Sequence, residues 1–273
     1  MTSTDPILVI GGTGKTGRRV AARLAARGVP VRIGSRTGTP PFDWEDPATW
    51  APALRGTRAA YISFFPDLAV PGAPAAIAEL ARTALAAGTR RLVLLSGRGE
   101  EEAERAEQEL IASGADWTIV RCSWFSQNFS EDHFHDHVMA GELALPVGDV
   151  PEPFVDADDI ADVAVAALTD DRHVGELYEL TGPRLLTFAD AAREIGEAAG
   201  RSVRLTPVSA RQFAEPGIRE SPGQGTHCVV IVREETPVAR EIFDRIATER
   251  HLPESDEIGS GVERSLRRRH HLV

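Results

Sequence analysis

The chain has few cysteines and no long hydrophobic stretch. Its 273 residues include two cysteines, Cys122 and Cys228, and no Cys-x-x-Cys motif. This scarcity excludes a disulfide framework and predicts a reducing, cytoplasmic compartment. No apolar run approaches the roughly 18–20 residues of a membrane-spanning helix. The first apolar run, Ile7–Ile10, is too short for a secretion signal and leads directly into glycines. We therefore expect a soluble, intracellular protein with no membrane partner.

Basic residues are outnumbered, with 30 lysines and arginines against 41 acidic residues. The formal net charge is −11, which disfavours nucleic acid and anionic membranes as partners because both require a positive face. The basic run Arg267–His271 is a local exception without interleaved aromatic residues, and we expect it to be a solvated terminus. A small-molecule substrate is the expected partner, with the protein acting as a monomer or a homodimer.

Short apolar runs alternate with alanine-rich and leucine-rich segments at helical spacing, which is typical of βαβ units. The pattern predicts an α/β protein: a Rossmann-type, doubly wound, mostly parallel sheet with a smaller C-terminal lobe. We expect a dinucleotide-binding domain over residues 1–130 and a substrate-binding lobe over 131–273. Residues of about 154–182 are expected to return to the sheet, and a short strand is expected around Phe42–Trp44.

The strongest local signal is a glycine turn after the strand Ile7–Ile10. Gly11, Gly14 and Gly17 follow this strand and open a helix. In dinucleotide-binding proteins the first such glycine permits a tight turn, the second admits the pyrophosphate and the third allows close helix–sheet packing. The start of the helix then offers unpaired N–H groups to an anion. The turn therefore predicts a nicotinamide dinucleotide site.

The end of the second strand predicts which dinucleotide is bound. NAD-binding proteins carry an acidic residue there, whereas an arginine accommodates the 2′-phosphate of NADP. The sequence here is Ile33-Gly34-Ser35-Arg36, with no acid. Pairing of guanidinium with phosphate favours NADPH. The alternative is that Arg36 is only a surface residue.

The chain has only two tyrosines, and this is its most informative scarcity. Short-chain dehydrogenases protonate their product with Tyr-x-x-x-Lys, but neither Tyr61 nor Tyr178 has a lysine four residues on. Two hypotheses follow. The protein is an NADPH-dependent reductase of an acceptor that needs little acid help, such as an iminium, an imine or an activated conjugated compound. Alternatively, it is a non-catalytic redox sensor or regulator that binds the dinucleotide.

Several segments resemble one family. The chain is similar to the NmrA-like atypical short-chain dehydrogenases, and within them to the ergot-alkaloid reductases. Besides the glycine turn, the resemblance is carried by Phe42–Trp44, Leu94–Ser96, Ser113–Arg121, Trp124–His133 and Phe154–Ala161. It extends from about Ile7 to Phe213, so substrate residues beyond Phe213 are left unassigned.

The resemblance implies a set of site residues. Arg36 would hold the 2′-phosphate, Asp43 and Trp44 would lie beside the adenine, and Ser63 with Phe64 would contact the middle of the cofactor. Ser96 and Cys122 would border the nicotinamide, although relatives often have proline where this chain has Cys122. The pyrophosphate would be held by Gly11, Thr13, Gly14, Lys15, Thr16 and Gly17.

The substrate side is expected beyond the carboxyl ends of the strands. Phe65, Trp124, Phe125 and Asn128 are candidates for the wall of a flat hydrophobic substrate; the alternative for the aromatic residues is loop packing. Ser96 is the candidate catalytic group as a hydrogen-bond donor, or else it only caps its strand. No histidine base lies near Cys122 in the sequence, so a small buried thiol is expected there. We expect no metal.

Overall fold

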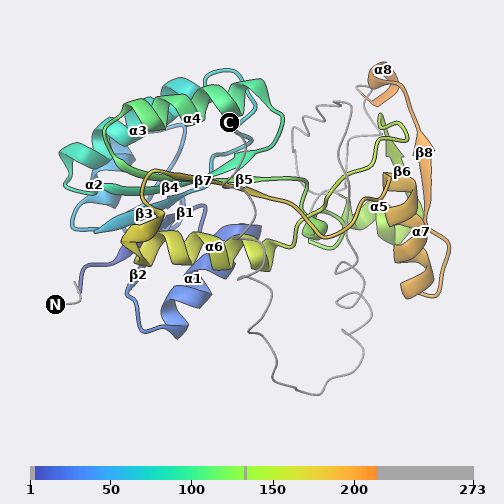
Figure 1. Ribbon diagram of the computed structural model, residues 1–273, viewed down its shortest axis with the longest axis horizontal. Coiled ribbons are helices and arrows are strands. Elements are labelled where there is room, and N and C mark those ends of the chain that lie inside the picture. The colour runs from blue at the N-terminus through green and yellow to red at the C-terminus, as the bar shows by residue number, and fades with distance from the viewer. Residues whose placement is uncertain (1–3, 132–133, 214–273) are drawn as a thin grey trace, which may run out of the picture.

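Six parallel strands form the central sheet, in the order β2-β1-β3-β4-β5-β7 (Figure 1). The computed structural model describes residues 4–131 and 134–213. The strands of the sheet are β1 (Ile7–Ile10), β2 (Val31–Gly34), β3 (Ala59–Ile62), β4 (Arg91–Gly97), β5 (Asp116–Cys122) and β7 (Glu176–Leu180). The strand order reverses beside β1, and in open parallel sheets ligands bind at the carboxyl ends of the strands near such a reversal.

Helices cover both faces of this sheet. On one face lie α3 (Ala73–Ala86) and α4 (Glu101–Ala112), and on the other α1 (Lys15–Ala26) and α6 (Ala157–Thr169) (Figure 1). Strand β1 has all four residues buried, because its side chains alternate between the two cores. The predicted Rossmann-type α/β fold with a mostly parallel sheet is therefore confirmed.

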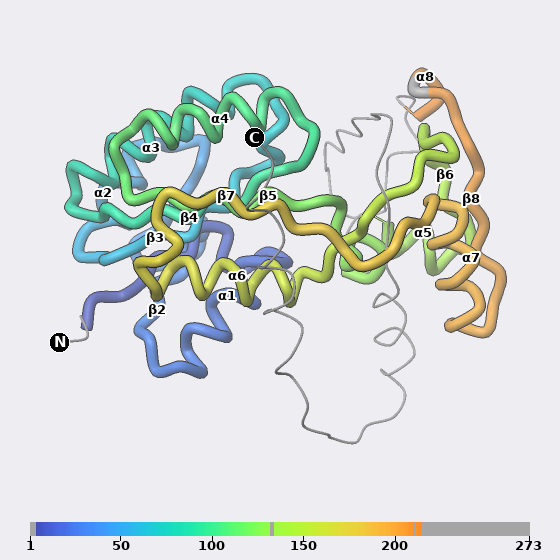
Figure 2. The backbone as a smooth tube through the Cα atoms, in the orientation of Figure 1, coloured from blue at the N-terminus to red at the C-terminus, as the bar shows by residue number. Residues whose placement is uncertain are grey.

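A smaller lobe is built from later residues. It contains the parallel pair β6 (Glu142–Leu145) and β8 (Arg204–Pro207), with helices α5 (His135–Ala140), α7 (Phe188–Ala198) and α8 (Ala210–Phe213). Its core is aromatic, with Phe129, Phe134, Phe154 and Phe188 packed edge to face or tilted. Figure 2 shows the chain crossing from the sheet to this lobe after β5 and returning before α6.

Short helices complete the described part of the chain: α2 (Trp50–Leu54) and the 3₁₀ turns η1 (Pro47–Thr49), η2 (Ser126–Asn128) and η3 (Asp171–His173). Helix α7 begins where its sequence indicates. The Thr187 hydroxyl accepts a hydrogen bond from the Asp190 N–H, and the Asp190 carboxylate accepts one from the Thr187 N–H. This capping box satisfies two N–H groups that the helix cannot pair itself.

The prediction of a strand around Phe42–Trp44 is wrong. This segment is a turn closed by a bridge between Asp43 and Asp46, and it pairs with no strand of the sheet. The Trp50 indole N–H donates to the Asp43 carbonyl at 2.6 Å. The Phe42 ring stacks on the Trp50 ring at 6.1 Å. The aromatic residues that suggested a strand are used to anchor this turn against the core.

The described helices are short. The longest, α3, has 14 residues and extends about 21 Å at 1.5 Å per residue, less than the roughly 30 Å of a bilayer core. In residues 4–131 and 134–213, no helix has the length and apolar character to cross a membrane.

Candidate dinucleotide site

The turn after β1 has no room for ordinary side chains. Gly11 has φ of +72°, a conformation that L-residues rarely adopt. A β-carbon on Gly17 would lie 2.2 Å from the Gly11 carbonyl oxygen, and one on Gly12 would lie 2.8 Å from the Val9 carbonyl oxygen. These contacts bring the start of α1 directly against the end of β1. The cradle is therefore made of backbone.

The first turn of α1 suits an anion. Gly14 is the N-cap and offers no side chain to the helix, and no acidic residue lies in the first turn. The Gly14 N–H is bonded to the Gly11 carbonyl at 2.9 Å, which closes the turn. The N–H groups that follow have no partner within the helix, and the helix dipole makes this end positive. The residues present thus fit a pyrophosphate group.

Thr16 faces the protein interior. The Tyr61 hydroxyl on β3 donates to the Thr16 hydroxyl at 2.9 Å, and both side chains are buried. Thr16 can therefore offer an anion its backbone N–H but not this buried hydroxyl. Burial raises the pKa of Tyr61, and the hydrogen bond to Thr16 opposes that shift only in part.

Lys15 joins the glycine turn to the segment after β5. Its ammonium donates to the Asn128 side-chain oxygen at 2.6 Å and lies 5.7 Å from the centre of the Phe125 ring. Asn128 is buried in η2, so the hydrogen bond directs its amide toward the turn. Two residues predicted for different ligands, pyrophosphate and substrate, thus lie together.

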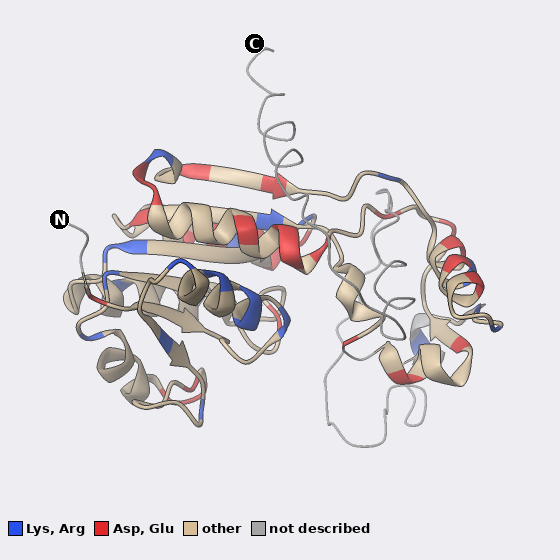
Figure 3. Ribbon diagram, turned by 90° about the horizontal axis from the view of Figure 1, so that it is seen from below, with Lys and Arg blue, Asp and Glu red and all other residues tan. Residues whose placement is uncertain are grey.

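Ion pairs hold the segment after β5 and helix α6 against α1, and the sequence analysis did not predict them. The Arg19 guanidinium donates to Glu131 at 2.7 Å and to Asp158 of α6 at 3.2 Å. Arg23 bonds Asp158 at 2.9 Å and Asp162 at 2.6 Å. Figure 3 shows the basic residues of α1 beside the acidic residues of α6. The matching four-residue spacings, Arg19 with Arg23 and Asp158 with Asp162, were the available signal.

Burial opposes ionisation of Glu131, but the bonds from Arg19 and the charge of Arg18 outweigh it and lower its pKa. Arg18 also bonds Glu131 directly. Because Glu131 remains ionised, its ion pairs with Arg18 and Arg19 of α1 persist at neutral pH.

The region predicted to hold the adenine contains the exposed Arg36 and a group of aromatic rings. Arg36 is exposed just after β2, and within the described residues its guanidinium makes no ion pair. The Trp44 indole N–H donates to the Ser63 carbonyl at 3.1 Å, and its ring lies 4.6 Å from that of Phe64. Ser63 in turn faces Gly11, since a β-carbon on that glycine would lie 3.1 Å from the Ser63 β-carbon. Three segments predicted to contact the cofactor, those of Trp44, Ser63–Phe64 and Gly11, therefore lie together.

Ser96 on β4 is not free to donate a proton. Its hydroxyl donates to the fully buried Glu107 carboxylate at 2.6 Å, and Arg121 pairs with the same carboxylate. A serine hydroxyl has one hydrogen, so Ser96 retains only acceptor capacity toward any other group. Cys122, in register with Gly97 at the end of β5, is buried, and burial raises the pKa of its thiol.

The aromatic substrate candidates divide into two groups. Phe65 is 59% exposed after β3. Trp124 instead packs into the lobe, stacked on Phe134 at 5.9 Å and edge-on to Phe188 at 5.5 Å. Phe125 is partly buried and its backbone bridges Val155. Phe65 therefore projects into solvent, whereas Trp124 helps to form the lobe core.

The sequence analysis did not include Glu100 among the predicted site residues. It begins α4 as the N-cap, but its side chain makes no capping bond. Instead its carboxylate folds over Gly97, the last residue of β4, where a β-carbon would lie 1.9 Å from Glu100 Oε2. Burial, together with the charges of Asp67 and Glu152, raises the pKa of Glu100 to about 7. Within a run of glutamates, nothing in the sequence distinguishes it.

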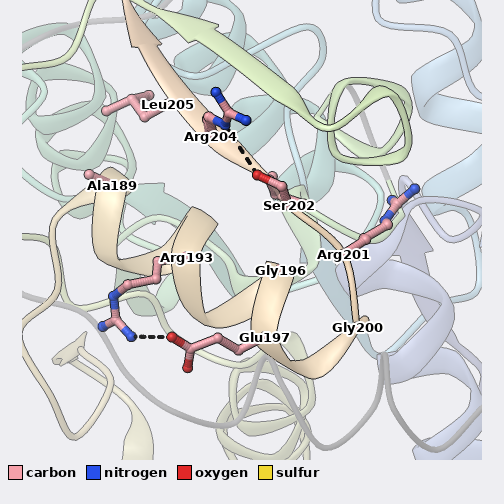
Figure 4. Close-up of a pocket in the computed structure, with 10 residues that line it drawn as sticks. Ala189, Arg193, Gly196, Glu197, Gly200, Arg201, Ser202, Arg204 and Leu205 are labelled. Atoms are coloured by element: carbon pink, nitrogen blue, oxygen red, sulfur yellow. Dashed lines mark hydrogen bonds and ion pairs between the residues drawn. The ribbon is translucent and has the colours of Figure 1, made fainter.

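A cavity of about 660 Å³ lies between α7 and the segment 200–205, apart from these residues (Figure 4). Three arginines border it, Arg193, Arg201 and Arg204, but in Figure 4 their side chains point in different directions. Arg193 is bonded to Glu197 and Arg201 to the carbonyl oxygens of Val138 and Met139. No predicted cofactor or substrate residue lines this cavity.

The fold and the glycine cradle define a Rossmann-type dinucleotide-binding protein. A family model described as NAD(P)H-binding matches residues 11–171. The protein belongs to this NAD(P)H-binding family, and its similarity to an ergot-alkaloid reductase, given below, confirms the resemblance found in the sequence.

Two curated relatives illustrate the family. An uncharacterized oxidoreductase of Bacillus subtilis, YesF, is 34% identical over 220 residues, covering 77% of this chain and 76% of the relative. Agroclavine dehydrogenase of Claviceps fusiformis is 30% identical over 235 residues, covering 76% and 78%. The match extends over most of both proteins, and oxidoreductases are therefore among the relatives of this chain.

Solved structures share the fold. Triphenylmethane reductase of Citrobacter sp., complexed with NADP(H), superimposes with a TM-score of 0.59 at 20% identity, covering 76% of this chain and 80% of that one. NmrA, a negative transcriptional regulator, has the same TM-score at 18% identity, covering 76% and 75%. At this level of identity the comparison supports the architecture alone.

Gly17→Ala tests the cradle. The added methyl group meets the Gly11 carbonyl, so we expect α1 to shift and the dissociation constant for NADPH to rise more than about tenfold. Fluorescence titration of NADPH measures the effect. Gly148→Ala is the matched control, because a β-carbon there meets no atom within 4 Å. Equal affinity in both variants would show that the cradle does not hold the dinucleotide.

Glu100→Gln tests the raised pKa of Glu100 through its effect on the free energy of unfolding. A glutamate in the unfolded chain titrates near pH 4.3, whereas the folded pKa of Glu100 is about 7. The wild type therefore loses stability between these values as pH rises, and glutamine does not. We expect the variant to match the wild type at pH 4 and to exceed it at pH 8 by on the order of 2 kcal/mol, after solvent screening.

Thermal unfolding across this pH range measures the difference. Glu101→Gln is the control, since Glu101 is exposed and paired with Arg105. Parallel pH–stability curves for the wild type and Glu100→Gln would contradict the raised pKa.

Proposed function

We propose that this protein is an NADPH-dependent reductase that transfers hydride to a small organic acceptor. The acceptors we propose are iminium ions, imines and activated conjugated compounds. The observation that carries the proposal is the backbone cradle before α1, combined with the absence of Tyr-x-x-x-Lys from the sequence. A bound reduced nicotinamide would supply the hydride.

Each part of the site has a proposed role. Arg36 pairs with the 2′-phosphate, Asp43 lies beside the adenine, and Ser63 with Phe64 supports the middle of the dinucleotide. Ser96 and Cys122 border the nicotinamide, and Ser96 accepts a hydrogen bond there because its own hydrogen is given to Glu107. The pyrophosphate is held by Gly11, Thr13, Gly14, Lys15, Thr16 and Gly17.

The substrate is proposed to lie against Phe65, Phe125 and the accessible edge of Trp124. Asn128 contributes indirectly, by holding Lys15 at 2.6 Å. Neither tyrosine is available as the general acid that short-chain dehydrogenases use. The Tyr61 hydroxyl is bonded to Thr16, and the Tyr178 hydroxyl lies 2.7 Å from His173 Nδ1. Positioning of donor and acceptor would therefore supply most of the rate.

An iminium acceptor already carries positive charge, so hydride arrival neutralises it and leaves no anion to protonate. A quinone or enone differs, because hydride arrival leaves a delocalised anion. Both classes suit a site without a tyrosine acid, and they make different demands on the remaining residues.

Turnover of NADPH with panels of iminium ions and quinones tests the proposal. We expect consumption with at least one class, followed by NADPH absorbance and by product mass. Micromolar or tighter NADPH binding with no turnover in either panel would replace the reductase with a non-catalytic redox sensor.

Arg36→Ala tests the coenzyme assignment. Removing the guanidinium should raise the dissociation constant of NADPH by about tenfold or more and leave that of NADH nearly unchanged, since only NADPH carries the 2′-phosphate. Arg27→Ala controls for the lost charge, because Arg27 is exposed beyond the opposite end of α1. Equal losses for both coenzymes would remove Arg36 from the site.

A further inference from the structure

Reduction of a neutral conjugated acceptor requires a proton as well as a hydride. The obvious donors near the strand ends are already committed. Ser96 donates its hydrogen to Glu107 and Tyr61 donates to Thr16, beneath α1. Cys122 is buried, with its thiol directed at the Val120 carbonyl. A different group must therefore supply the proton.

Glu100 has the required position. Its carboxylate lies over Gly97 at the carboxyl end of β4, and Gly97 is in register with Cys122 at the end of β5. This is the edge of the sheet where parallel α/β proteins bind their ligands. Glu100 is the N-cap residue of α4, but its side chain makes no capping bond and is directed to Gly97 instead. Among the described residues its carboxylate has no hydrogen-bond or ion-pair partner.

The surroundings of Glu100 favour its protonated form. Asp67, from the loop after β3, and Glu152, from the segment before α6, face it with negative charge. Its own helix adds Glu101, which pairs with Arg105. The dipole of α4 would favour ionisation, but burial and the two carboxylates outweigh it and raise the pKa of Glu100 to about 7. A donor with a pKa near the working pH is the most effective general acid.

We propose that Glu100 is the proton donor for acceptors that become anionic on reduction, namely quinones and enones. The inference rests on the proposed function. The acceptor carbon or oxygen gains a hydride with its electron pair from the reduced nicotinamide. The Glu100 O–H bond breaks, its proton joins the anionic oxygen or α-carbon, and the Glu100 carboxylate regains a proton from water. Iminium ions do not use this step.

The test compares wild type, Glu100→Gln, Glu100→Asp and the control Glu101→Gln, each with one quinone and one iminium acceptor. For the quinone, we expect wild-type kcat to fall above about pH 7. Glu100→Gln should lower kcat by about 100-fold and remove this dependence. Glu100→Asp should recover part of the rate and the pH dependence. Iminium reduction and the NADPH dissociation constant should be unchanged in all four proteins.

A second readout requires no turnover. Difference infrared spectroscopy of the coenzyme-free protein should show a carboxylic acid titrating near pH 7 in the wild type and in Glu101→Gln, but not in Glu100→Gln. If this band does not depend on Glu100, the donor assignment is overturned.

The kinetic outcomes are also separable. An unchanged quinone rate in Glu100→Gln overturns the donor role, and so does an equal loss with both acceptors, which would indicate positioning. If the wild type binds NADPH but reduces neither acceptor, the proposed function itself fails, and the donor role with it. Turnover by the wild type without an effect of Glu100→Gln leaves the proposed function standing and removes only the donor.

Discussion

The close approach of α1 to the end of β1 is the constraint on which the rest of the structure depends. A single β-carbon at Gly17 would overlap the Gly11 carbonyl. With no side chain between them, the helix packs against the strand and its first N–H groups point beyond the sheet edge. Two further residues lie against that backbone surface: Tyr61 of strand β3 lies beneath the helix, and Ser63, just beyond that strand, lies beside the turn.

The small lobe is attached to this same helix. Glu131 and Asp158 lie on either side of the first segment of the lobe, which contains α5 and β6, and both bond Arg19. Such partly buried ion pairs contribute little net stability compared with apolar packing, but losing one member leaves an uncompensated charge. Their value here is geometric: they fix both ends of this first segment of the lobe to the helix that would hold the pyrophosphate. Lys15 and Asn128 extend the tie to the loop after β5.

Two glutamates of the α4 segment, Glu100 and Glu107, lie against the end of β4 with different partners. Glu107 is fully buried, Arg121 pairs with its carboxylate, and Ser96 donates a hydrogen bond to it. Glu100 has no cationic partner among the described residues and faces Asp67 and Glu152, so its proton is retained toward neutral pH. The two carboxyl groups belong to one helix segment, and they differ in the charges that the tertiary structure places beside them.

Local chemistry determined much of this protein from the sequence alone. Alternating apolar runs specified the parallel sheet, three glycines specified the turn, and Thr187 marked the start of α7, because each depends on residues close together in the chain. The aromatic run at Phe42–Trp44 misled because ring packing with Trp50 outweighed strand propensity. Only the tertiary structure decided the partners of Ser96, Arg19 and Glu100. Arg19 meets residues 112 and 139 positions away, and the neighbours of Glu100 come from two separate loops and from the end of β4. Strand order and helix packing, which no short stretch of sequence encodes, bring such charges together and so set which of them keeps its proton.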